Sequence, residues 1–240
     1  MGALGVSELL VAWERAYGQR PAMRALTLVA AASGGDEGDP RRLSVGDRDV
    51  RLLAVRESVF GDALESTADC AACGETMELS FRTSDVRAPR TALPGPLAVE
   101  GYEVEWRLPT SGDLAELRPD EAPDAARARL VEGCVVRARR GEEDVLPRDL
   151  PAAVREALAR AVESADPQAD VALTAPCPEC GHSNEVPFDV ATFFWEELNA
   201  WALRTLQDVH TLACAYGWSE REVLSMTSFR RQLYLEMLGS

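Results

Sequence analysis

Two cysteine motifs of the same form constrain the fold of this 240-residue chain more than any other feature. Each reads Cys-x-x-Cys-Gly, and Cys177 lies 107 positions after Cys70. Structural zinc takes four ligands in tetrahedral geometry, and one Cys-x-x-Cys turn supplies two thiolates. Because the chain contains two such turns, we predict one structural zinc ion bound by Cys70, Cys73, Cys177 and Cys180.

The residues that follow the two motifs also resemble each other. In both, a glutamate follows the glycine by four positions, and an aliphatic residue, a spacer and a phenylalanine come next. Each turn is therefore predicted to lead into an alternating strand, with Met77, Leu79 and Phe81 in the first and Val186 and Phe188 in the second. This is the arrangement of a zinc ribbon split by a long insertion, which is tolerated because loop-closure entropy grows only logarithmically with length.

Other uses of the cysteines fit the sequence less well. A disulfide or a redox-active thiol pair needs an oxidising compartment or a thioredoxin-like setting, and neither is visible. A catalytic zinc needs an open coordination position and a nearby base. His182 follows Cys180 by two residues and could intrude as a ligand, but a solvent-exposed or hydrogen-bonding role is favoured. The metal is therefore expected to stabilise the fold without catalysing a reaction.

Outside the two cysteine motifs, the sequence contains few residues in patterns typical of catalysis or ligand binding. Cys134 and Cys214 lie in predicted helices and are interpreted as core side chains, and His210 as a half-buried, hydrogen-bonded histidine. The sequence contains no nucleophile elbow, no phosphate-binding glycine loop and no recognisable pair of catalytic carboxylates. We therefore predict that the protein is not an enzyme and has no small-molecule substrate.

The charge of the chain limits its partners. The formal net charge is −15, and the 25 basic residues are all arginine. An acidic chain is poorly suited to a phosphate backbone, so no nucleic-acid partner is expected. No segment is apolar over the thickness of a bilayer, and the first residues do not read as a signal peptide, so no membrane contact is expected. The predicted location is the cytoplasm, or an assembly that forms there.

Length and hydrophobic periodicity indicate an α+β protein that forms a single domain over residues 1–240. Its first expected part is a helical N-terminal unit at 1–58. A small sheet with the split zinc ribbon and a helical insertion follows at 59–188. The last part, at 189–240, is expected to be a C-terminal helical hairpin or bundle.

Local signals define the expected elements within these parts. Ser7, Ser44 and Ser219 are predicted to cap helices, Pro21 to begin one, and Gly217 to end the longest. Helices are predicted over 7–17, 22–32, 44–57, 122–137, 151–164, 190–216 and 219–226, and from 227 or 228 onward. Strands are predicted over 77–81, 102–108, 171–173 and 186–188, and an acidic break over 33–39.

An aromatic cluster stands out in the C-terminal part. Its members are Phe193, Phe194, Trp195, Trp201, Tyr216 and Trp218. The first three are consecutive, so one helix cannot direct all of them into one core. Either a second element covers the other side, or one face is left for a protein partner, since aromatic anchors are favoured at interfaces. The sequence leaves both interpretations open.

Several segments, taken in order, resemble one known family. They are Trp13-Glu14, Arg24-Ala25-Leu26, the two cysteine turns, Arg107-Leu108-Pro109-Thr110 with Asp113, Phe194-Trp195-Glu196-Glu197-Leu198, His210, Ala215-Tyr216-Gly217-Trp218-Ser219-Glu220, Val223-Leu224, Arg230-Arg231 and Tyr234-Leu235. Together they resemble the T-even-type phage baseplate proteins. This family comprises baseplate hub components and hub assembly chaperones, and it also occurs in phage-like contractile injection systems.

The resemblance implies a non-enzymatic structural or assembly protein of a contractile tail baseplate, present in the bacterial cytoplasm during assembly or in the finished particle. Its partners would be other baseplate or hub proteins, docked by the C-terminal helices. Two other classes of function stay open on the residues alone. One is a zinc-ribbon protein that binds nucleic acid or acts as a regulator, and the other is a thiol redox switch without bound metal.

Overall fold

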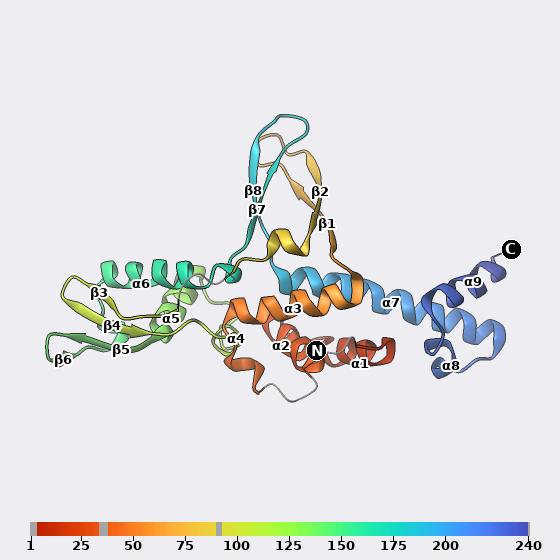
Figure 1. The fold of residues 1–240 in the computed structure, drawn as a ribbon, viewed down its shortest axis with the longest axis horizontal. Helices are drawn as coiled ribbons and strands as arrows, with labels where there is room; N and C mark the ends of the chain where they lie inside the picture. Colours follow the sequence, from red (N-terminus) through yellow and green to blue (C-terminus); the bar gives the residue numbers. More distant parts are fainter. Residues whose placement is uncertain (1–3, 34–37, 90–92, 240) are drawn as a thin grey trace.

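Helices and several small sheets make up the chain, which confirms the predicted α+β class. The computed structural model describes residues 4–33, 38–89 and 93–239, and the acidic break predicted over 33–39 lies largely outside them. Figure 1 shows a central group of helices from which a pair of hairpins projects. A sheet with two helices lies at one end of the molecule, and short helices lie at the other.

The helical body comprises α1 (Val6–Ala16), α2 (Pro21–Ala32), α3 (Val45–Phe60) and the first half of α7 (Val190–Tyr216). As predicted, Pro21 occupies the first turn of α2, and the Ser44 hydroxyl accepts the Asp47 N–H at 3.1 Å to cap α3. The helices share one apolar core. Its largest fully buried side chains include Val29, Leu52, Leu53, Phe194 and Leu198.

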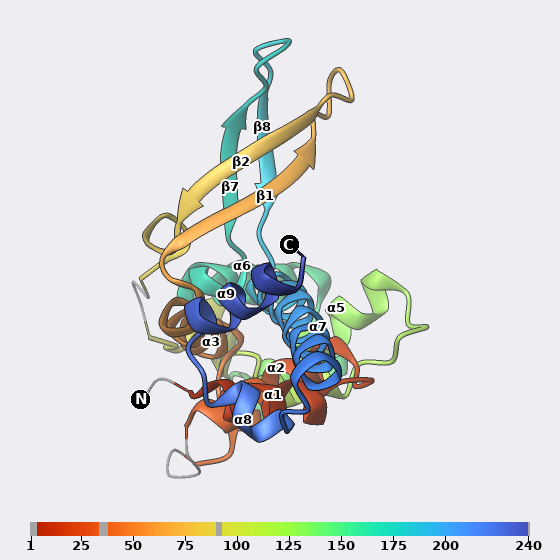
Figure 2. The same ribbon diagram turned by 90° about the vertical axis from the view of Figure 1, so that its right-hand side faces the viewer.

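Two antiparallel hairpins form the arm that projects from this body (Figure 2). The first pairs β1 (Ala63–Asp69) with β2 (Thr76–Arg82), and the second pairs β7 (Ala172–Pro176) with β8 (Ser183–Pro187). Asp69 pairs with Thr76 in the first, and the residues 107 positions later, Pro176 and Ser183, pair in the second. The repeat seen in the sequence is therefore a repeat of structure, with the same register in both hairpins.

The insertion unit lies between the two hairpins in sequence. It contains a sheet with strand order β3 (Leu97–Val99), β4 (Tyr102–Trp106), β5 (Val135–Arg140) and β6 (Glu143–Asp144), together with α5 (Pro123–Cys134) and α6 (Ala152–Ala165). Val104 and Ala138 of the sheet share a buried core with Val154 and Leu158 of α6. This unit therefore has a core of its own, separate from that of the helical body.

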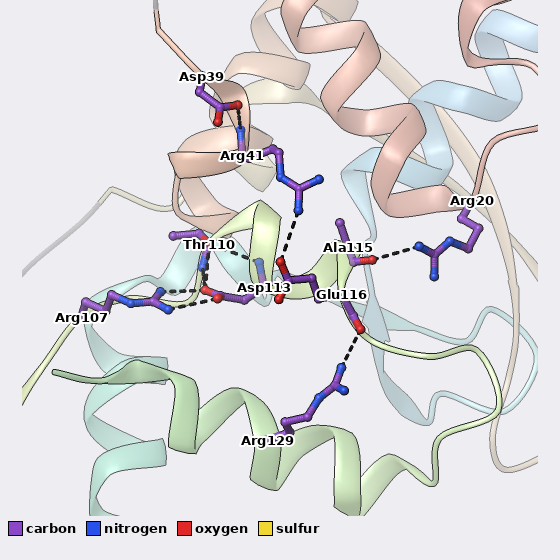
Figure 3. Close-up of polar contacts among 9 residues, drawn as sticks. All are labelled: Arg20, Asp39, Arg41, Arg107, Thr110, Asp113, Ala115, Glu116 and Arg129. Carbon is purple, nitrogen blue, oxygen red and sulfur yellow. Dashed lines mark hydrogen bonds and ion pairs between the residues drawn. The ribbon is translucent and has the colours of Figure 1, made fainter. Parts of the chain in front are cut away.

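The short helix α4 (Ser111–Ala115) is the joint between the helical body and the insertion unit (Figure 3). The Thr110 hydroxyl and the Asp113 carboxylate cap its first turn reciprocally. Arg107 donates to both carboxylate oxygens of Asp113, at 2.7 and 3.0 Å. Arg20 donates to the Ala115 carbonyl at 3.1 Å from the body. The Arg107 to Asp113 segment thus serves to fix this joint.

The head is formed by the end of α7, α8 (Glu220–Leu224) and α9 (Ser228–Leu238). Gly217 ends α7 in the left-handed conformation with φ 70°, as the sequence predicts. Ser219 and Thr227 cap the two short helices through their hydroxyl groups. The remaining short elements are the 3-10 turns η1 (Pro40–Arg42), η2 (Thr83–Val86), η3 (Pro147–Asp149) and η4 (Pro167–Ala169).

Two predicted helices and the predicted single sheet need correction. The helix expected over 122–137 ends at Cys134, because Val135 begins strand β5 and the Cys134 carbonyl accepts the Arg107 N–H at 2.8 Å. The first helix is not capped by Ser7: it begins at Val6, and the Glu8 carboxylate accepts the Gly5 N–H at 2.8 Å. Strand β1 was not predicted, and the expected small sheet is divided into separate sheets.

Candidate metal centre

The two cysteine turns close the free ends of the hairpins with the same hydrogen bonds. In the first, the Cys70 N–H donates to the Glu75 carbonyl at 2.8 Å, and the Gly74 N–H donates to the Cys70 carbonyl at 2.9 Å. In the second, the Cys177 N–H donates to the His182 carbonyl at 2.8 Å, and the Gly181 N–H donates to the Cys177 carbonyl at 2.9 Å. Both glycines have positive φ, 75° and 72°, which explains the glycine after each motif.

These turns bring the four predicted cysteines together. Sγ of Cys70 lies 3.7 Å from that of Cys180, and Sγ of Cys73 lies 3.7 Å from that of Cys177. All four sulfurs lie within 4.8 Å of one another. A zinc–sulfur bond of about 2.3 Å places tetrahedral sulfurs roughly 3.8 Å apart. The arrangement therefore has the size and the donor set of a four-thiolate metal site.

A buried asparagine, Asn184, holds the two turns against each other. Its Oδ1 accepts the backbone N–H of Ala71 at 2.9 Å, and its Nδ2 donates to the His182 carbonyl at 3.0 Å. Nδ2 also lies 3.6 Å from Cys70 Sγ. Sequence reasoning missed this residue, although the repeat contains the signal. Asn184 occupies the position that Met77 holds in the first hairpin, and its Nδ2 lies 3.4 Å from the Met77 sulfur.

The thiols differ in acidity because their hydrogen-bond partners differ. The backbone N–H of Cys73 and the Asn184 amide lower the pKa of Cys70 to about 6, in spite of desolvation. The backbone N–H of Glu75 lowers the pKa of Cys73, but the three neighbouring cysteine sulfurs and desolvation together raise this pKa to about 12. Four crowded sulfurs thus do not all ionise at neutral pH unless a cation compensates their charge.

The base of the arm is tied to the helical body by aromatic contacts. The rings of Phe81 and Phe188, equivalent residues of the two hairpins, pack edge to face with centroids 5.3 Å apart. Phe188 also lies 5.1 Å from Phe193 in the first turn of α7. The arm is therefore joined to the body by packed side chains at its base and carries the four sulfurs at its far end.

Comparison with known families identifies the chain. The family model described as T4 bacteriophage base plate protein matches residues 24–195, 172 of the 240 residues. The chain belongs to this family. The matched segment includes both hairpins, the insertion unit and the joint at α4. No curated protein and no solved structure matches the chain.

Family membership confirms the resemblance and indicates a structural role in a phage baseplate. Among the described residues, the four cysteines of this baseplate protein are the group of ligand-type side chains close enough to hold a metal ion. His182 is exposed, and its backbone contacts the second turn: its carbonyl accepts the Cys177 N–H at 2.8 Å, and its backbone also hydrogen-bonds the Cys180 thiol. None of the described helices combines the length and the apolar character that crossing a membrane requires.

Three further predictions about single residues have different outcomes in the baseplate protein. Cys134 is buried, as expected for a core side chain, but Cys214 and His210 are both exposed. Their side chains lie 3.9 Å apart on the outer face of α7. The predictions for Cys214 and His210 failed because this part of α7 packs against α8 and α9 through Val209 and Leu212, whereas His210 and Cys214 lie on its exposed face.

The aromatic cluster packs within the baseplate protein from several sides. Phe194 is buried against Phe60 of α3, while Trp195 lies beneath the Arg24 guanidinium of α2. In the head, Tyr216 and Trp218 stack at 4.5 Å, and both rings contact Tyr234. Other elements therefore cover the consecutive aromatic side chains, which favours the core interpretation over the interface one.

Proposed function

We propose that this protein is a non-enzymatic structural or assembly component of a contractile tail baseplate or hub, in phage or in a phage-like injection system. A single zinc ion bound by Cys70, Cys73, Cys177 and Cys180 stabilises its fold, and its C-terminal helices dock neighbouring baseplate or hub proteins. The chain acts as one zinc-containing domain. It acts in the bacterial cytoplasm during assembly or in the finished particle.

The observation that carries the zinc proposal is the approach of sulfurs from two separate hairpins. The sulfur distances of 3.7 Å within each cross-hairpin pair suit tetrahedral zinc and exceed the roughly 2.05 Å of a disulfide. Each two-stranded hairpin buries little apolar area by itself, and such hairpins are marginal in isolation. A metal that joins their free ends would therefore contribute much of the arm's stability.

Metal analysis of the purified protein tests this proposal. We expect one zinc per chain, lost in the Cys70→Ser and Cys177→Ser variants. Cys214→Ser is the matched control, because Cys214 is exposed and lies outside the cluster. Absence of zinc from the natively purified wild-type protein, or equal zinc in all variants, would contradict the proposal.

The docking proposal is supported by apolar side chains that the head leaves exposed. Phe229, Leu233 and Met237 recur every fourth residue of α9, and Phe229 and Met237 are 73% and 64% exposed. Such a stripe on one helix face is typical of a surface that binds another protein. The charge of the arm favours a protein partner over a nucleic acid, since its hairpins at 63–82 and 172–187 contain six acidic residues against one arginine and one histidine.

Co-purification with the products of neighbouring tail genes tests the proposed role. We expect the tagged full-length protein to capture at least one baseplate or hub protein during assembly. Tails that assemble normally without this protein, together with no captured partner, would contradict the role. The same proteins should be captured after nuclease treatment, which separates this role from the alternative in which nucleic acid is the partner.

A further inference from the structure

A pocket of about 530 Å³ lies at the base of the arm, away from the four cysteines at its free end. Its walls come from the starts of α2 and α3, from α4, and from the chain on either side of the β7–β8 hairpin. Pro21, Leu114, Val171 and Phe188 provide apolar surface. The volume falls in the range of about 300–1,000 Å³ that is common for ligand pockets.

Negatively charged residues outnumber positively charged ones in this pocket. One arginine, Arg48, and three aspartates, Asp49, Asp170 and Asp189, line it. Arg48 Nε donates to Asp49 Oδ1 at 2.7 Å, and both side chains are more than nine-tenths buried. The guanidinium is therefore neutralised by the carboxylate beside it. Asp170 and Asp189 are exposed and form no ion pair among the described residues, so the pocket carries an excess of negative charge.

The buried aspartate of this pocket, Asp49, indicates which sign of charge a bound ligand would carry. Desolvation raises the pKa of Asp49 above its ordinary value, and the negative charge of Asp189 adds to the rise. A cation entering the pocket would offset both effects, whereas an anion would face three carboxylates and one arginine that is already paired. Apolar walls around an acidic centre suit a cation carried on an aliphatic stem.

We propose that this pocket receives an arginine or lysine side chain of a neighbouring baseplate polypeptide, a proposal that rests on the proposed function. A protein source is favoured because the pocket is larger than one such side chain, so residues that flank the cation would also contact its apolar walls. The inserted side chain would contact the helical body, the joint at α4 and the base of the arm together. It would therefore fix the arm in one orientation relative to the body.

Removing the two exposed charges tests the proposal without removing a helix cap. Asp189 caps α7 by accepting the N–H groups of Ala191 and Thr192 at 3.0 and 3.2 Å. Asparagine also caps helices, so the Asp170→Asn/Asp189→Asn double variant is expected to fold as the wild type does. The matched control is Glu103→Gln/Asp120→Asn, which removes two exposed charges outside the pocket.

The probe is Nα-acetyl-arginine methylamide, titrated into the full-length protein and followed by amide chemical shifts in NMR spectra. We expect saturable shifts around the pocket and no such shifts with the neutral citrulline analogue. The double variant should bind about tenfold more weakly, as expected for the loss of two half-exposed ion pairs. The control variant should bind as the wild type does.

Three outcomes would overturn the proposal: no saturable binding of the arginine probe, equal binding of the citrulline analogue, or unchanged affinity in the double variant. A titration with spermidine distinguishes the source of the cation. Tighter saturable binding of spermidine at the same residues would assign the pocket to a small polycation instead. Zinc content and capture of tail proteins are measured separately, so this proposal can fail while the proposed function stands.

Discussion

Asn184 accepts a hydrogen bond from the backbone N–H of Ala71, a residue 113 positions earlier in the chain, at 2.9 Å. This contact joins the second hairpin to the first cysteine turn independently of any metal. Replacing Asn184 by leucine, which has a similar volume, would leave the Ala71 N–H without its acceptor. Loss of a hydrogen bond in a partly buried setting costs about 1–3 kcal/mol.

We therefore expect Asn184→Leu to lower the thermal stability of the arm and to speed the loss of metal to a chelator. Amide hydrogen exchange at Ala71 would report the change directly. Ser183→Ala is the control, because Ser183 is exposed and precedes Asn184 in the same strand. If Asn184→Leu keeps its metal as firmly as the control does, the asparagine has no part in holding the turns together.

Metal binding is expected to depend on pH. The Cys73 thiol, with its pKa raised to about 12, is protonated in the metal-free protein at neutral pH. Zinc must displace this proton, so the apparent affinity should weaken as the pH falls and protons compete with the metal. Calorimetry in buffers of different ionisation enthalpy would count the protons released. Binding without proton release would show that the sulfurs are not the ligands.

Gly46 is required where α3 meets η4. Its N–H donates to Asp166 Oδ2 at 2.9 Å, and a Cβ on Gly46 would lie 2.1 Å from Asp166 Oδ1. Gly46→Ala should therefore destabilise the protein by about 2–4 kcal/mol, through overpacking and the loss of this hydrogen bond. Denaturant unfolding measures the effect.

Gly133→Ala provides the matched control for Gly46→Ala. Gly133 lies in α5, and a Cβ there would meet nothing within 4 Å. Alanine favours the helix by up to about 1 kcal/mol over glycine, so this variant should be as stable as the wild type or more so. Equal destabilisation by both substitutions would rule out the contact with Asp166 as the cause.

Strong local signals allowed much of this fold to be predicted. The longest helix has the predicted bounds, since its apolar residues recur at helical spacing and Gly217 ends it. The cysteine cluster was predicted from ligand type and spacing, and the four sulfurs do lie together. These features depend on short stretches of sequence, in which one physical cause dominates.

Features that depend on distant partners were not predicted. Strand β1 alternates Leu64, Ser66 and Ala68 on its inner side, a weak apolar pattern that becomes a strand because it pairs with β2. In β5, Ala138 is the buried residue, so no strand periodicity is visible. His210 was expected to be half-buried, and only the three-dimensional structure shows that it lies on an exposed face of α7.

The Arg107–Asp113 ion pair predicts a change in stability at low pH. Hydrogen bonds from Arg107, and then from Thr110, lower the pKa of Asp113 from 3.8 to about 2. The pair therefore contributes its full stability above pH 3.8 and loses it as the pH falls from 3.8 to about 2. Because Arg107 is 41% exposed, we expect a contribution of roughly 1 kcal/mol or less.

Comparing the wild type with Asp113→Asn across this pH range tests the prediction. Asparagine still accepts the capping hydrogen bonds, so the variant removes the charge and leaves the cap. Urea unfolding should show the wild type to be more stable at pH 5, with the difference shrinking toward pH 2.5. A difference that does not vary with pH would exclude the ion pair as its source.

The apolar stripe of α9 predicts variants that lose partners without losing the fold. Phe229 and Met237 are 73% and 64% exposed, so the Phe229→Ser/Met237→Ser double variant removes little buried surface. Its thermal stability should stay close to that of the wild type, whereas capture of baseplate or hub proteins should fall at least tenfold, since large apolar anchors often dominate binding energy. Val136→Ser is the control, because Val136 is 63% exposed but lies on the insertion unit. Undiminished capture by the double variant would place the docking surface elsewhere on the molecule.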